Sequence, residues 1–180
     1  AAKRAKQGDK EAIAKRDVLG PVVEGLRAGV PARNVQLTAE QRKTLKGLHL
    51  LTSKPVLYVS NVDEGSVASG NSLSQQVEAR AKAEGAGHVV ISAEIEAEVA
   101  QLSDREEKRA FLDDLGLEES GLARTIKEGF RLLNLITFFT AGPKEAHAWT
   151  VRNGANAPEA AGVIHSDMER GFIRAETIFW

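Results

Sequence analysis

The sequence predicts an α/β part built on a parallel strand–helix–strand unit, followed by a smaller α+β part. Two short apolar runs rich in β-branched residues, Val56–Val59 and His88–Ser92, flank a segment that reads as a helix, Ser72–Glu84. After Leu133 the pattern changes to two apolar segments separated by a Gly-Pro turn, which is typical of a hairpin. The 180 residues, 42% hydrophobic and 27% charged, suffice for one medium domain or two small ones with a real core.

Apolar positions recur at near-helical spacing from Asp9 to Ala28, although Gly20-Pro21 is expected to interrupt or kink this helix. A linker follows at Gly29–Arg33, indicated by its Gly and Pro. Thr38–Gln41 fits a capping box, which predicts a helix running to about His49.

The two apolar runs are expected to be strands covered on both faces, joined in parallel by the helix, which Gly85–Gly87 ends. Three further helices are predicted, the second capped by Ser103 and stopped by Gly116. They cover Ile95–Leu102, Arg105–Leu115 and Leu122–Leu133.

The α+β part has strands at Leu135–Thr140 and Ala146–Val151, a helix at Pro158–Asp167, and a third, alternating strand at Gly171–Ile178. Its aromatic residues are interpreted as core, although an exposed sheet face could stack RNA bases. These residues are Phe138, Phe139, Trp149 and Phe172.

Composition and charge narrow the class of protein. No apolar run approaches the ~18–20 residues that span a bilayer, so no membrane partner is expected. The chain has no cysteine and no signal-peptide pattern, which favours the cytoplasm. It opens without Met and stops inside a strand-like segment, so we expect a fragment.

Charge is unevenly distributed along the chain, despite a net charge of −1. Residues 1–50 hold eleven Lys or Arg against five acids, whereas residues 92–119 hold ten acids against three bases. The first bases, Lys3, Arg4, Lys6 and Lys10, could face RNA phosphates, and a solvated helix surface explains them equally well.

The chemistry-bearing residues follow the two predicted strands, at the sheet edge where open α/β sheets bind ligands. GTPases grip guanine there with Asn-Lys-x-Asp and Ser-Ala-Lys, whereas this chain has Asn61-Val62-Asp63-Glu64 and Ser92-Ala93-Glu94. Glu is one methylene longer than Asp, so it would not meet guanine in the same geometry. The amide of Asn61 can match the N6 amine and N7 of adenine, and turn chemistry is the alternative explanation of the motif.

Two strand-end stretches, "KPVLYVSNVDEG" and "HVVISAE", and the block "FLDDLGLEESGLARTIKEGFRLLNLITFFTAGPKEAHAWTVRNGANAPEAAGVIHSDMERGFIRAETI" closely resemble the C-terminal portion of the YchF or Obg-like ATPase family. In that family Asn-x-x-Glu replaces the guanine motif, and ATP is preferred over GTP. The resemblance implies that Asn61 contacts adenine, Val62 adds a backbone contact and Glu64 holds the specificity position. It also implies that Ser92 and Ala93 support the base.

The resemblance implies three regions. Residues 1–35 are the returning part of an inserted helical (coiled-coil) arm, and 36–133 the C-terminal part of a P-loop NTPase domain with its βαβ sheet. Residues 134–180 are a truncated TGS domain of the β-grasp (ubiquitin-like) fold. It further implies an ATP hydrolase that acts with the ribosome in translation or stress responses, with ATP and Mg²⁺ as cofactors and no DNA partner.

The sequence also departs from the family. No Gly-x-x-x-x-Gly-Lys-Ser/Thr phosphate loop occurs in it, so its residues are not expected to hydrolyse ATP unaided, and the Mg²⁺ ligands are expected elsewhere. For the same reason no catalytic residue is predicted within it. No metal site is predicted either, because its four histidines lack metal-ligand spacing. The alternative function is a non-enzymatic RNA- or ribosome-binding module.

Overall fold

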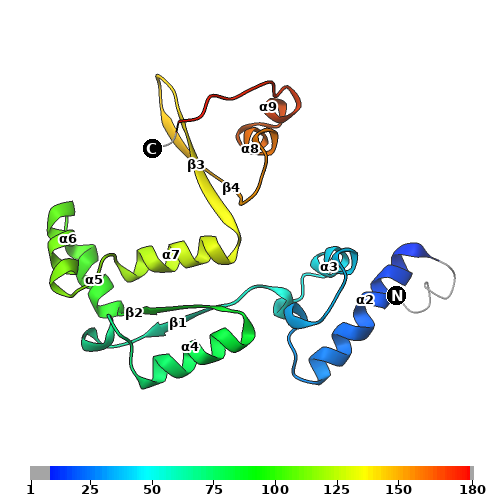
Figure 1. Cartoon of the computed structure of the whole chain (residues 1–180), viewed down its shortest axis with the longest axis horizontal. Coiled ribbons are helices and arrows are strands. Elements are labelled where there is room, and N and C mark those ends of the chain that lie inside the picture. Colours follow the sequence, from blue (N-terminus) through cyan, green and yellow to red (C-terminus); the bar gives the residue numbers. More distant parts are fainter. Residues whose placement is uncertain (1–8, 179–180) are drawn as a thin grey trace. The chain divides into compact units, whose positions relative to one another are not determined.

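The computed structural model describes residues 9–178, so Lys3, Arg4 and Lys6 lie outside the described residues. The described chain forms two compact units (Figure 1). One comprises residues 9–56 with 82–86, and the other residues 57–81 with 87–178. The three regions expected from the sequence, 1–35, 36–133 and 134–180, stay predictions.

The first unit is built on two helices. Helix α2 (Lys10–Arg27) begins at Asp9, whose Oδ1 accepts hydrogen bonds from the backbone of Glu11 (3.0 Å) and Ala12 (3.2 Å). The sequence predicts that Gly20-Pro21 interrupts or kinks this helix. The interruption is wrong, because α2 runs through Pro21 without a break, and the kink stays a prediction. Proline removes one backbone donor, but the neighbouring residue Val22 is buried in the core, and this burial favours the helix.

Helix α3 (Ala39–Lys46) starts with the predicted capping box, in which Thr38 and Gln41 each bond the other's backbone N–H. Short 3-10 turns at Ala32–Asn34 (η1) and Leu51–Ser53 (η2) complete the connections. The core of the unit consists of Val18, Val22, Ala32, Val35 and Leu45.

The second unit contains the predicted parallel pair, β1 (Leu57–Asn61) and β2 (Gly87–Ile91), linked through α4 (Ser72–Glu84). In the register Asn61 lies opposite Ile91, so both strands end at one edge. The expectation that both strands are covered on both faces is wrong for β1 among the described residues, because Val59 remains 46% exposed.

Three helices follow β2, as predicted: α5 (Ala93–Gln101), α6 (Arg105–Asp114) and α7 (Gly121–Leu132). The cap of α6 is not Ser103. Asp104 holds that position and accepts from the backbone of Glu107 (3.4 Å), since an acceptor directly before the first helical residue reaches its free amides. Val67, Ile95, Leu112 and Leu117 form the core beneath these helices.

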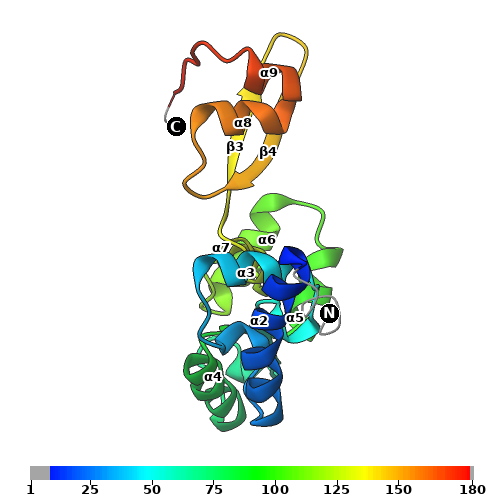
Figure 2. The ribbon, with the colours of Figure 1, turned by 90° about the vertical axis from the view of Figure 1, so that its right-hand side faces the viewer.

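The predicted hairpin is confirmed as an antiparallel pair, β3 (Leu135–Ala141) and β4 (Ala146–Arg152), in which Phe138 lies opposite Trp149. Figure 2 shows α8 and α9 beside this hairpin. The core interpretation is wrong for Phe139, which is 65% exposed. Trp149 is half-buried, and its ring N–H donates to the Thr140 hydroxyl (2.9 Å).

Two further expectations for this region are wrong. The single helix divides into α8 (Ala157–Ile164) and α9 (Ser166–Arg170), because His165 is extended and its Nδ1 accepts from the backbone of Asp167 (3.2 Å). The third strand is absent over 171–178. Alternating side chains suit a strand, but a strand also needs a ladder partner, and the described residues supply none there.

Candidate functional site

The parallel pairing of β1 and β2 places the two sequence motifs together. The backbone N–H of Ala93 donates to the side-chain Oδ1 of Asn61 (2.9 Å), across 32 positions of sequence. Beside it, the N–H of Val62 donates to the carbonyl of Ile91 (2.9 Å), extending the ladder by one bond. The structure therefore brings together Asn61, Val62, Ser92 and Ala93, while their roles in binding stay predictions.

The amide of Asn61 is held in a defined orientation at an exposed position. Its oxygen accepts from Ala93 and retains a second lone pair, while its NH₂ group supplies donors. A donor and an acceptor on one fixed amide can pair with an adjacent acceptor and donor on a ligand. The arrangement is therefore suited to reading the edge of a planar heterocycle.

Ser92 directly precedes Ala93 in the chain and is 1% exposed. It occupies the N-cap position of α5, yet its hydroxyl makes no cap bond and has no hydrogen-bond partner among the described residues. Buried hydroxyls normally find partners. The Ser92 hydroxyl is thus a buried group, unpaired among the described residues, next to the N-terminus of α5.

Glu64 opens the short 3-10 turn η3 (Glu64–Ser66) on the chain that leaves β1. It is exposed, and its carboxylate makes no hydrogen bond or ion pair with another described residue. The structure places Glu64 three positions beyond Asn61 without joining the two side chains. Lys10, the described member of the basic group, is exposed at the start of α2, in the other unit.

Glu96 supports the site, although the sequence pattern gave it no role. Its carboxylate on α5 accepts from the backbone of Gly121 (2.6 Å) and Leu122 (3.1 Å), at the start of α7. A carboxylate at a helix N-terminus satisfies free N–H groups and complements the helix dipole. Glu96 thus ties α5, which carries Ala93, to α7. The two ends of this contact are 25 and 26 positions apart, so no local sequence pattern pointed to it.

No group of three or more His, Cys, Asp or Glu is arranged to hold a metal ion among residues 9–178. In that same range no helix combines the length and apolar character needed to cross a bilayer.

A parallel β-α-β unit that carries polar side chains at the carboxyl ends of its strands defines an α/β protein of the open-sheet, ligand-binding class. Comparison with known proteins narrows this class. The family model YchF-GTPase_C, described as a protein of unknown function (DUF933), matches residues 135–180. The chain is 51% identical over 178 residues to the ribosome-binding ATPase YchF of Bacillus subtilis, covering 98% of this chain and 48% of that protein.

The ribosome-binding ATPase YchF of Escherichia coli O157:H7 is 47% identical over 176 residues, again covering 98% of this chain and 48% of the relative. A solved structure of the Schizosaccharomyces pombe YchF GTPase superposes with a TM-score of 0.75 at 29% identity, over 87% of this chain and 42% of that one. These matches place the chain in the YchF family and confirm the resemblance read from its sequence. The chain spans about half the length of the curated relatives it matches.

Proposed function

We propose that the protein to which this chain belongs binds and hydrolyses ATP in preference to GTP and acts with the ribosome, in the cytoplasm. The names of its relatives, ribosome-binding ATPases, support this proposal. Its regions are an inserted helical arm (1–35), the base-binding part of a P-loop domain (36–133) and a TGS domain (134–180). The nucleotide proposal rests on a single observation. The backbone N–H of Ala93 donates to Oδ1 of Asn61 and holds that amide in place where the two strands end.

In this proposal the chain supplies the purine-binding half of the site. The NH₂ group of Asn61 donates to N7 of adenine, and the second lone pair of its oxygen accepts from the N6 amine. Val62 adds a backbone contact, and Ser92 with Ala93 supports the base from the next strand end. Glu64 holds the position that separates adenine from guanine.

The phosphates and Mg²⁺ are assigned to the rest of the protein. The sequence has no phosphate loop, and the described residues include no metal-ligand cluster, so hydrolysis needs groups from the rest of the protein. Phosphoryl transfer depends on holding the phosphates and metal in place. We therefore expect these 180 residues alone to be inactive as an ATPase.

The test is the ATP affinity of the full-length protein with Asn61→Ala. Loss of a two-point contact to the base should weaken ATP binding by about tenfold or more. The matched control is Asn156→Ala, which removes the cap of α8 (Asn156 Oδ1 accepts from Glu159 at 3.0 Å) without touching the strand ends. Unchanged ATP affinity in Asn61→Ala, measured by calorimetry, would refute the assignment of that residue.

A second function, RNA or ribosome binding without catalysis by this part of the chain, is favoured by the basic residues 1–50 and by the names of the relatives. The two functions are compatible in one protein. They differ in which residues matter, because base binding depends on the strand ends and RNA binding on Lys3, Arg4, Lys6 and Lys10.

A further inference from the structure

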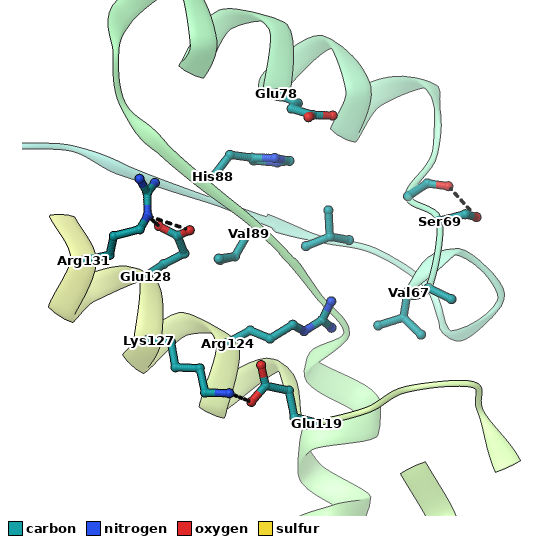
Figure 3. Close-up of a pocket in the computed structure, with 13 residues that line it drawn as sticks. Val67, Ser69, Glu78, His88, Val89, Glu119, Arg124, Lys127, Glu128 and Arg131 are labelled. Carbon is teal, nitrogen blue, oxygen red and sulfur yellow. Dashed lines mark hydrogen bonds and ion pairs between the residues drawn. The ribbon is translucent and has the colours of Figure 1, made fainter. Parts of the chain in front are cut away.

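A cavity of about 490 Å³ lies in the second unit, away from the Asn61 amide. Figure 3 shows Val89 of β2 on the side of the α7 side chains and His88 of β2 next to Glu78 of α4; all of these residues line the cavity. The segment 67–70, which leads into α4, forms another part of its wall. Its volume is in the range of small-molecule sites.

Arg124 on α7 lines this cavity. Its Nε and Nη2 atoms are both buried and have no hydrogen-bond partner among the described residues. These two nitrogens form the edge of the guanidinium that grips a carboxylate with two parallel hydrogen bonds. A buried charged donor without a partner is costly, so the arrangement calls for an anion that the described residues do not supply.

The other bases of the cavity are already paired. Lys127 bonds Glu119 at 2.5 Å, and Arg131 bonds Glu128 at 2.7 Å. Among the basic residues that line the cavity in the described chain, Arg124 therefore has two donor nitrogens, Nε and Nη2, without a hydrogen-bond partner. Glu119 and Glu128 are the partners of those bases, and Glu78 adds a third carboxylate to the wall. Three acids thus balance three bases, so a singly charged anion is accommodated more easily than a dianion such as phosphate.

We propose that this cavity is a carboxylate-binding site, in which Nε and Nη2 of Arg124 hold both oxygens of one carboxylate. In the present conformation the two nitrogens are closed off from solvent. Binding therefore includes a rotation of the Arg124 side chain that turns its free edge into the cavity it lines, a change of the size common at binding sites. The carboxylate comes either from a small molecule or from an acidic side chain elsewhere in the full-length polypeptide.

The experiment compares the full-length protein with its Arg124→Met variant, using acetate as the probe. Arg109→Met is the matched control, because Arg109 is a surface residue of α6 with an 85% exposed side chain. Acetate binding is followed by saturation-transfer NMR and by the shift of the melting temperature against chloride at equal ionic strength. If the carboxylate is a small molecule, acetate should raise the melting temperature of the wild type and the control, and its affinity should fall about tenfold or more in Arg124→Met.

The melting temperature without acetate tests the second source, an acidic side chain of the full-length protein. If an acidic side chain of the full-length protein already holds Arg124, acetate has no effect, and Arg124→Met melts several degrees lower than Arg109→Met because a buried carboxylate loses its partner. The proposal is overturned if acetate has no Arg124-dependent effect and Arg124→Met is as stable as the wild type or more so. That result is expected for a guanidinium with no anion to bind, because Met fills similar space without buried donors.

Discussion

At the scale of single residues, the site depends on one hydrogen bond between distant parts of the sequence. Asn61 ends one strand and Ala93 follows the next, and the bond between them fixes an exposed amide. Ser92, which directly precedes Ala93 in the chain, is buried, and its hydroxyl has no partner among the described residues. In the proposed function Asn61 pairs with N7 and the N6 amine of adenine, and Glu64 holds the position that separates adenine from guanine.

Glu64→Asp tests this division of roles. A carboxylate one methylene shorter approaches the geometry that accepts from the N1–H and N2 amine of guanine, so the preference for ATP over GTP should fall about tenfold. The measurement is the ratio of the two dissociation constants in the full-length protein. Asp63→Glu changes length at the neighbouring exposed position and should leave the ratio unaltered; an equal shift in both variants would contradict a specific role for Glu64.

At the scale of elements, contacts at the first turn of helix α7 hold that helix in place. Glu96 caps it from α5, and Gly121 allows the close approach to β2 that this cap requires. A Cβ at Gly121 would lie 2.8 Å from Cγ2 of Ile91 and 2.9 Å from Oε1 of Glu96. Both distances are shorter than real side-chain contacts, so the glycine is needed for packing here.

Two glycines of α7 give opposite predictions. Gly121→Ala should destabilise the protein by about 1–3 kcal/mol, because Ile91 or the Glu96 cap must move. Gly129→Ala should stabilise it by about 0.5–1 kcal/mol, because no atom lies within 4 Å of the added Cβ and alanine favours a helix. Denaturant unfolding of the two variants measures both values, and destabilisation by Gly129→Ala would show that the space beside it is filled.

At the scale of the whole molecule, the strand-end residues and the basic residue Lys10 belong to different compact units. If the proposed functions hold, substitutions at the strand ends and at Lys10 should impair nucleotide binding and RNA binding separately. The first unit has its own core and an ion pair between Arg33 and Glu84 (3.1 Å) whose side chains are mostly buried. Substitutions on the exposed start of α2 should leave that core intact.

Neutralising Lys3, Arg4, Lys6 and Lys10 to Gln tests the basic arm. If these residues face RNA phosphates, ribosome affinity should fall, and the slope of log K against log salt should become shallower by about 3, or 0.7 for each lost phosphate contact. ATP affinity should not change. An unaltered slope would assign these bases to a solvated surface.

The sequence alone was sufficient for the elements with strong local patterns. The Thr38–Gln41 box, the parallel strands around α4 and the β3–β4 hairpin follow from capping, apolar runs and turn residues, and all are present. The family also followed from the sequence, because the long block after Phe111 is distinctive. These features depend on neighbours within a few residues or on the order of residues itself.

Tertiary structure decided what local pattern does not contain. Pro21 stays helical because Val22 beside it is buried. Residues 171–178 form no strand, because no other segment within residues 9–178 pairs with them. The Ala93–Asn61 bond and the Glu96 cap join residues far apart in sequence. The burial of two nitrogens of Arg124, Nε and Nη2, likewise depends on the folded chain. Burial and hydrogen bonding at long range depend on which surfaces meet, and that information appears only once the chain is folded.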